Sequence, residues 1–168
     1  NFAGAQPQSD DITILLLELP LIDRRHSECF SGGPGLTSRL HHWLLPLLET
    51  LALSGETVSE LALVAEEIVT NVEKYAALSN DQYIEVTLLT QPDKIILQIK
   101  DKGTPFNPLL EAQRAVLGDD IESAGIGGLG VHLAIELTDK QIYNYDGEHN
   151  ILRLEKNLGG GGARVGLS

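Results

Sequence analysis

The segment from Val58 to Ala77 constrains the fold most, because its polar and apolar residues separate at a helical period. Helical residues advance by about 100° each, which sorts this segment into two stripes. One stripe is apolar and must be buried against another layer: Leu61, Ala65, Ile68, Val72 and Ala76. The other lies about 120° away and is polar: Glu60, Glu67, Asn71 and Lys74. The polar stripe alone fits an ordinary solvated face as well as a binding site.

The remaining segments surround this helix with strands. β-type patterns predict strands over 11–19, 83–90, 94–100, 141–145 and 151–155. Helical spacing predicts further helices over 36–53, with a kink at Pro46, and over 109–117 and 129–137. The stretch between Pro20 and Leu36 reads as a loop, with its clearest turn at SGGPG. This order predicts an α+β two-layer sandwich, in which helices cover one face of a mixed, mostly antiparallel sheet.

Composition narrows the class of protein. The chain has 168 residues, enough for one globular domain, and a net charge of -12, which argues against nucleic acid as a partner but not against ATP. Its single cysteine, Cys29, excludes an internal disulfide and is more often a buried apolar residue than a catalytic thiol. No apolar run spans a membrane and no signal-peptide pattern opens the chain, so we expect a cytoplasmic protein. Because the chain starts at Asn1 and lacks Met, we expect a piece of a longer protein.

Two further segments carry residues suited to a nucleotide. In DKGTPF, an aspartate at the end of a strand can accept from an exocyclic amine, and Gly103 permits close approach of a flat ring. In GIGGLGVHLAIEL, glycines open a helix, and helix N-termini are natural phosphate sites. A capped turn and a hinge would explain the two segments separately. Neither a dinucleotide fingerprint nor a P-loop is present.

Taken in this order, EEIVTN, DKGTPF and GGLGVHLA resemble the three nucleotide boxes of the GHKL ATPase superfamily. The resemblance is closest to its anti-sigma factor serine/threonine kinase branch and covers roughly residues 25–157. It implies the histidine-kinase-like ATPase fold, with ATP and Mg²⁺ as ligands. Mg²⁺ prefers oxygen ligands, and phosphoryl transfer rests mainly on positioning and charge neutralisation, which suits such a set of residues.

The resemblance also implies a role for each matching residue. On the first box, Glu67 would be the general base, Asn71 the ligand of the phosphate-bridging Mg²⁺, and Lys74 a cation near the phosphates. On the second, Asp101 would bind adenine, with Gly103 beneath the ring. On the third, the glycines that wrap the triphosphate would be Gly128 and Gly130. The second hydrogen-bonding residue around adenine is not identifiable, since no suitable threonine stands near the last strand.

A second resemblance lies at the start of the chain. FAGAQPQSDDITILLLEL is similar to the closing segment of protein phosphatase 2C-type sigma-regulatory serine phosphatases, where Asp10 would bind Mn²⁺ or Mg²⁺. We therefore expect three parts: a phosphatase-like remnant over 1–20, a GHKL-type kinase domain over 21–158 and a flexible tail over 159–168.

The expected function is phosphorylation of a serine or threonine of an anti-sigma factor antagonist of the STAS type, sequestration of a sigma factor, or both. A homodimer is one expected assembly. One alternative is a regulatory module that binds ATP without phosphoryl transfer. Another is the ATP-binding domain of a histidine kinase, whose Asn box can also take the form N-x-x-K-Y seen at Asn71–Tyr75. Against the latter stand Glu67 and the Pro105-Phe106 pair. A surface pair is the simpler explanation of His41 and His42.

Overall fold

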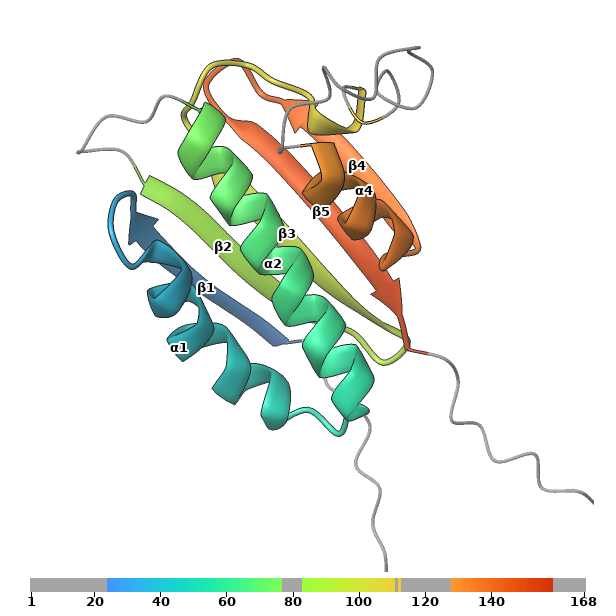
Figure 1. Ribbon diagram of the computed structural model, residues 1–168. Coiled ribbons are helices and arrows are strands. Elements are labelled where there is room, and N and C mark those ends of the chain that lie inside the picture. Colours follow the sequence, from blue (N-terminus) through green and yellow to red (C-terminus); the bar gives the residue numbers. More distant parts are fainter. Residues whose placement is uncertain (1–23, 77–82, 111, 113–127, 159–168) are drawn as a thin grey trace, which may run out of the picture.

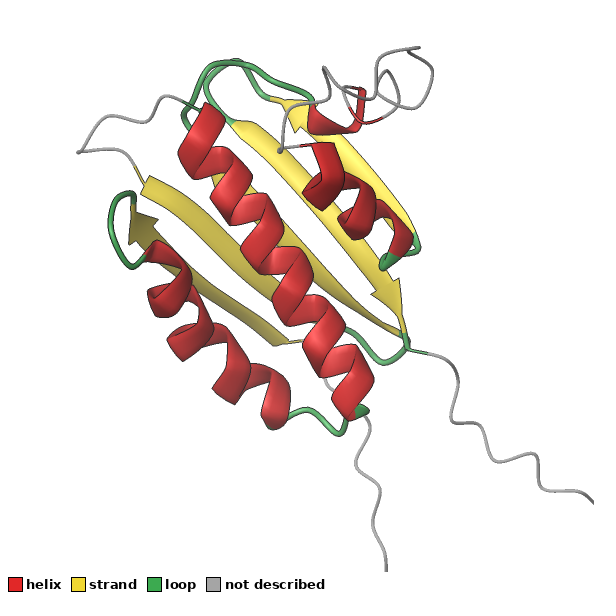
Figure 2. Cartoon of the chain, viewed as in Figure 1, coloured by secondary structure: helices red, strands yellow, loops and turns green. Residues whose placement is uncertain are grey.

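The computed structural model describes residues 24–76, 83–110, 112 and 128–158. In chain order its main elements are β1 (Arg24–Ser31), α1 (Leu36–Glu49), α2 (Gly55–Tyr75), β2 (Tyr83–Thr90), β3 (Lys94–Asp101), α4 (Gly128–Glu136), β4 (Lys140–Tyr145) and β5 (Asn150–Asn157). The five strands form one sheet in the order β1-β2-β3-β5-β4, and each neighbouring pair is antiparallel. Helices α1, α2 and α4 lie side by side on one face of it (Figures 1 and 2). The predicted α+β sandwich is thereby confirmed.

The core lies between the helices and that face of the sheet. Alternate residues of the two central strands point into it: Ile84, Val86 and Leu88 from β2, and Ile95, Leu97 and Ile99 from β3. Helix α1 contributes Leu36, Leu40, Leu44 and Leu48, which recur at helical spacing. The apolar stripe predicted on α2 is also buried, with Leu61, Ala65 and Ile68 at most 3% exposed. Burial of this apolar stripe fixes the rotation of α2, and with it the direction in which the polar stripe points.

The sequence analysis was wrong about the edge strand β1, because it assigned a loop between Pro20 and Leu36. Its sequence RRHSECFS has no run of apolar residues, and in β1 only Phe30 is buried. The strand forms because its whole length pairs with β2, from Arg24 opposite Thr90 to Ser31 opposite Tyr83. Backbone pairing with a neighbouring strand can impose extended structure where side-chain pattern does not predict it.

Element boundaries shift for local reasons. Helix α2 begins at Gly55, three residues before its expected start, because Ser54 caps it: the Ser54 hydroxyl accepts from the backbone N–H of Thr57 at 3.1 Å. Helix α1 continues through Pro46 to Glu49. No helix within the described ranges is both long and apolar enough to cross a membrane.

Several predictions fall outside the described residues. They are the strand over 11–19, the phosphatase-like segment with Asp10, the tail over 159–168, and most of the helix over 109–117. Of that helix, the described part is a helical turn that includes Leu109 and Leu110, followed by the buried Ala112.

Candidate functional site

A pocket opens between the C-terminal half of α2 and the sheet, where β3 ends and β5 begins. Its apolar lining comes from helix and sheet together: Ile68, Val72, Ile99, Val131 and Leu152. The segment that follows β3 supplies a further wall through Thr104, Phe106 and Pro108. The polar side chains that line it include Asn71, Asp101, Tyr143 and Asn150. An apolar slot with a few convergent polar groups is typical of small-molecule sites.

Asp101, the last residue of β3, is buried at 5% exposure. Its Oδ1 accepts two hydrogen bonds, from the backbone N–H of Gly103 at 2.8 Å and from Asn150 Nδ2 at 2.9 Å. Both bonds end on the same oxygen and fix the orientation of the carboxylate. Asp101, which lines the pocket, is therefore a hydrogen-bond acceptor with a fixed orientation.

Gly103 lies directly against the C-terminal end of α2. A Cβ at this position would lie 2.6 Å from the carbonyl oxygen of Ala76 and 2.8 Å from its Cα. The next residue, Thr104, donates its backbone N–H to the same carbonyl at 3.3 Å. The observed reason for glycine here is thus the contact between the β3 loop and α2. Its predicted place beneath a flat ring stays a prediction.

Of the three predicted residues on the polar stripe of α2, Asn71 lines the pocket and shares it with Asp101. The Nδ2 atom of Asn71 is buried, and among the described residues it has no hydrogen-bond partner. Leaving a buried amide unpaired costs about 1–3 kcal/mol, so such a group commonly serves a ligand or ordered water. Glu67 is half-buried one turn earlier, and Lys74 is exposed.

Helix α4 packs beside α2 (Figure 1), and Gly130 makes their contact at Glu67 possible. A Cβ on Gly130 would overlap the Glu67 Oε2 atom and lie 3.1 Å from its Cδ. The position therefore leaves space for the Glu67 carboxylate, an effect that the sequence analysis did not foresee. Gly128 is the first residue of α4. The predicted contacts of Gly128 and Gly130 with phosphate stay predictions.

Tyr143, from β4, adds a hydroxyl group to the lining of the pocket. The Tyr143 hydroxyl donates to Asn150 Oδ1 at 2.7 Å. Burial raises the pKa of Tyr143, and the negative charge of Asp101 acts in the same direction. The hydroxyl therefore keeps its proton and remains a donor at neutral pH.

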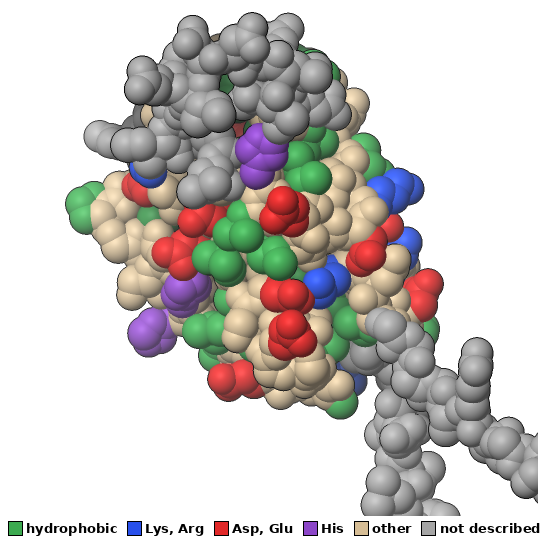
Figure 3. Space-filling view, turned by 45° about the vertical axis from the view of Figure 1, so that its right-hand side comes forward, with side chains coloured by type: hydrophobic (Ala, Val, Ile, Leu, Met, Phe, Trp, Pro, Cys, Tyr) green, Lys and Arg blue, Asp and Glu red, His purple; other side chains and the backbone are tan. Residues whose placement is uncertain are grey.

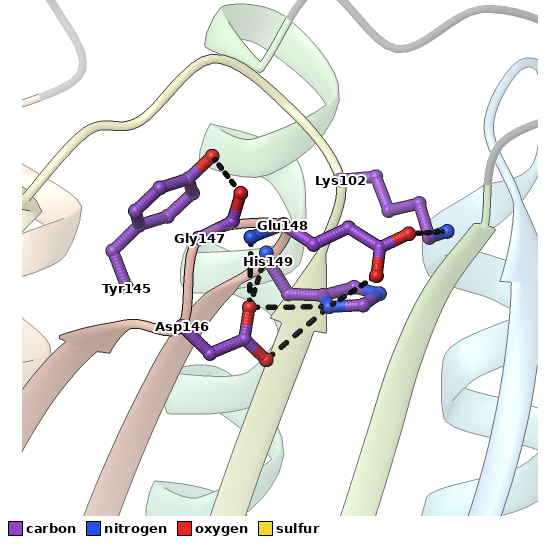
Figure 4. A network of polar contacts seen from close by, with 6 residues as sticks. All are labelled: Lys102, Tyr145, Asp146, Gly147, Glu148 and His149. Atoms are coloured by element: carbon purple, nitrogen blue, oxygen red, sulfur yellow. Dashed lines mark hydrogen bonds and ion pairs between the residues drawn. The ribbon is translucent and has the colours of Figure 1, made fainter.

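The turn between β4 and β5 is fixed by a second set of polar contacts (Figure 4). Asp146 Oδ1 accepts from the backbone N–H groups of Glu148 and His149 at 2.9 and 2.7 Å. Glu148 forms an ion pair with Lys102, which lies between Asp101 and Gly103 in the chain. The turn therefore connects β5 to the segment after β3, on the side of the pocket where Asp101 lies.

Histidine kinase-like ATPase domains match this chain over residues 30–156. The chain belongs to this family. Among curated relatives, the serine-protein kinase RsbW of Listeria monocytogenes serotype 4a is 33% identical over 99 residues, which is 55% of this chain and 62% of that protein. The RsbW of Listeria innocua serovar 6a is 32% identical over a stretch of the same length. The chain thus spans less than two thirds of these relatives. Among solved structures, the histidine kinase AdeS of Acinetobacter baumannii superposes on this chain with a TM-score of 0.45 at 14% sequence identity. The match covers 82% of this chain and 70% of the AdeS chain.

For a histidine kinase-like ATPase domain, the residue that the sequence analysis missed is Asn150. It opens β5, directly opposite Asp101 in the register of β3 and β5. The predicted strand began one residue later, at Ile151, which placed Asn150 in the preceding turn. A signal was present: Asn150 precedes Leu152 and Leu154 at a period of two, so it is a polar residue in the core-facing row.

The surface charge of this ATPase domain offers no large positive field to a phosphate ligand. In Figure 3 acidic side chains are spread over the face shown, with Lys and Arg side chains between some of them. The full chain carries a net charge of -12. Phosphates are held in proteins by local donors and metal ions rather than by net charge, so a nucleotide site here depends on individual side chains.

Proposed function

We propose that this domain binds ATP with Mg²⁺ and transfers the γ-phosphoryl group to a serine or threonine of an anti-sigma factor antagonist of the STAS type. The same domain would sequester a sigma factor when the antagonist is phosphorylated. Membership of the histidine kinase-like ATPase family supports nucleotide binding. Curated relatives named serine-protein kinase support the class of reaction.

The observation that carries the proposal is that Asn71 and Asp101, 30 residues apart in the chain, line one pocket. Asp101 is an acceptor fixed by two hydrogen bonds, which suits the exocyclic amine of adenine. We assign that amine to Asp101 Oδ2, since both fixing bonds end on Oδ1. The apolar lining of the pocket suits the faces of a purine ring.

We place the triphosphate and its metal at Asn71. Asn71 brings a carboxamide whose Nδ2 is buried and lacks a partner among the described residues, which suits a site completed by a ligand. Its Oδ1 would bind Mg²⁺, a hard cation that prefers oxygen. Lys74 and the α4 glycines Gly128 and Gly130 would contact the phosphates. When bound, Mg²⁺ neutralises phosphate charge.

Glu67 stands one helical turn before Asn71 on the same face of α2. As general base it would accept the proton of the attacking serine or threonine hydroxyl while that oxygen bonds to the γ-phosphorus. The bond to the bridging oxygen breaks, and ADP leaves with the electron pair. A carboxylate acting in this way contributes about 10²–10⁴-fold to the rate.

Phosphoryl transfer to a purified STAS-type antagonist from [γ-³²P]ATP tests this proposal. Glu67→Gln should lower the labelling rate by about 10²–10⁴-fold and leave ATP affinity nearly unchanged. Glu66→Gln is a matched control, because its carboxylate pairs with His41 on α1 at 3.2 Å instead of facing Asn71. Equal labelling by both variants would contradict the role of Glu67.

The same assay separates the two alternatives. ATP binding with no labelling of any antagonist or sigma factor partner would favour a regulatory module that binds ATP. An acid-labile label on the chain would instead favour a histidine kinase. The division at residues 20/21 and 158/159, a cytoplasmic location and a homodimer remain predictions from the sequence.

A further inference from the structure

Asn150 has the densest set of hydrogen bonds at the pocket, although no prediction included it. The side chain is 6% exposed. Its Nδ2 donates to Asp101 Oδ1 at 2.9 Å and approaches the carbonyl oxygens of Thr104 and Gly103 at 3.2 and 3.3 Å. Its Oδ1 accepts from the backbone N–H of Phe106 at 3.1 Å and from the Tyr143 hydroxyl at 2.7 Å. One side chain thus joins β3, β4, β5 and the segment after β3.

These bonds use the whole capacity of the amide. A carboxamide has two N–H donors and two lone pairs on its oxygen. The three acceptors around Nδ2 share its two hydrogens, and the two donors occupy the oxygen. The orientation of the amide is fixed as well, because a flipped side chain would set its NH₂ group against the Phe106 N–H. Asn150 therefore has no hydrogen-bonding group left for a ligand.

We infer that Asn150 is a positioning residue for nucleobase recognition, and this rests on the proposed function. It holds the Asp101 carboxylate in place from one side, while its oxygen holds the backbone of Phe106, a residue of the pocket wall. Tyr143 supports it by donating to the same oxygen. Base recognition in this chain then depends on Asp101 as the contact and on Asn150 as its orienter.

Asn150→Asp tests the inference, because it keeps the accepting oxygen and replaces the donor to Asp101 by a second oxygen. Two carboxylates would then meet at the 2.9 Å separation seen for the amide. Like charges so close raise the pKa of the pair. At pH 8 both ionise and repel, and we expect ATP affinity about tenfold or more below wild type. As the pH falls to 6, a shared proton restores the hydrogen bond, and the variant-to-wild-type affinity ratio should recover severalfold.

Asn144→Asp is the matched control, since it makes the same substitution at an exposed position of β4. Its affinity should stay near wild type at both pH values. An Asn150→Asp chain that binds ATP as wild type does at pH 8, or whose defect does not change with pH, would overturn the inference. Tyr143→Phe gives a second measurement if Asn150→Asp does not fold. It removes one bond to Asn150 Oδ1 and should raise KM for ATP about threefold with kcat unchanged, whereas an unchanged KM would also overturn the inference.

Asp101→Ala keeps this test separate from that of the proposed function. If Asp101→Ala binds ATP as tightly as wild type, the nucleotide site itself is wrongly placed. If Asp101→Ala abolishes binding while Asn150→Asp has no effect, the proposed function stands and only the role of Asn150 is refuted.

Discussion

The two ends of the pocket differ in how their polar groups are satisfied. At the proposed base end, Asp101, Tyr143 and Asn150 are each fixed by hydrogen bonds within the protein. At the proposed phosphate end, the buried Nδ2 of Asn71 has no such partner among the described residues. Glu67 and Lys74 are not among the residues that line the pocket, so their place at this end rests on the proposed function alone. Asn71 and Asp101 share an apolar lining that includes Ile68 and Leu152.

This difference separates two uses of a buried polar group. A satisfied network is rigid and contributes to folding, so the base end is organised before a ligand arrives. A buried amide without a partner lowers stability and is retained where a ligand completes it. We therefore expect substitutions at the base end to affect stability and binding together, and substitutions at Asn71 to affect binding alone.

Asp101→Ala should have the largest effect on binding. It removes the acceptor for the nucleobase and leaves Asn150 Nδ2 with a missing partner, so ATP affinity should fall about 100-fold or more. Calorimetric titration with Mg-ATP measures this, and a thermal melt should show a lower Tm as well. Asp93→Ala, at an exposed position in the turn between β2 and β3, should bind ATP as wild type does. If Asp101→Ala and Asp93→Ala bind ATP with equal affinity, Asp101 does not contact the nucleobase and the proposed base end is wrong.

Gly130→Ala should disturb the proposed phosphate end, at Glu67, and leave the hydrogen bonds of Asp101 and Asn150 intact. The new methyl group would overlap the Glu67 carboxylate and displace it. We expect kcat for phosphoryl transfer to fall about 10–100-fold, because a misplaced base loses much of its contribution. ATP affinity should fall as well, because Gly130 is also proposed to contact the phosphates, but by less than in Asp101→Ala, since Asp101 is untouched. Gly55→Ala is the matched control, because a Cβ there meets nothing within 4 Å. Unchanged kcat in Gly130→Ala would show that Glu67 is not the base or can move freely.

The base end also shows what the sequence could and could not predict. The position of Asp101 was predictable, because it directly follows the apolar stretch KIILQIK and stands two residues before Gly103. Its contact with adenine stays a prediction. Asn150 was not, since its role depends on strand register: it lies opposite Asp101 only because β5 pairs with β3 in this alignment. Side-chain periodicity predicts which face a residue occupies but not which residue it meets across the sheet.

The fold was predictable wherever apolar periodicity was strong, as in α1, α2, β2 and β3. It failed at β1, whose RRHSECFS sequence forms a strand through backbone pairing with β2. The glycines show a related limit. Gly103 and Gly130 were expected to serve a ligand, yet each also leaves room for a residue of α2, namely Ala76 or Glu67. Such close approaches between elements depend on packing geometry, which no local pattern contains.

A pair of isosteric substitutions sharpens the comparison in terms of stability. Asn150→Leu removes one of the two donors to Asp101 Oδ1 and leaves the Phe106 N–H and the Tyr143 hydroxyl without their acceptor. The free energy of unfolding should therefore fall by about 2–4 kcal/mol. Asn71→Leu removes an amide nitrogen that has no partner among the described residues. It should change that free energy by less than about 1 kcal/mol and lower Mg-ATP affinity about tenfold. Urea denaturation measures both variants. A large loss of stability in Asn71→Leu would mean that this side chain already has a structural partner.

The smallest effect should come from the turn beside the base end, at Asp146. Hydrogen bonds from the backbone N–H of Glu148 and then of His149 lower the pKa of Asp146 below its ordinary value. A carboxylate with a lowered folded-state pKa stabilises the fold above the unfolded-state pKa, which is about 3.9, and this stabilisation disappears as the pH falls through the folded-state value. Because Asp146 is exposed and its interactions are screened by solvent, Asp146→Ala should lower Tm only slightly at pH 7, and the difference from wild type should shrink below about pH 4. ATP affinity should change less than about twofold, because Asp146 contacts the turn and not the pocket. A Tm difference that stays constant down to pH 3 would show that the lost stability comes from the turn backbone rather than from the charge of Asp146.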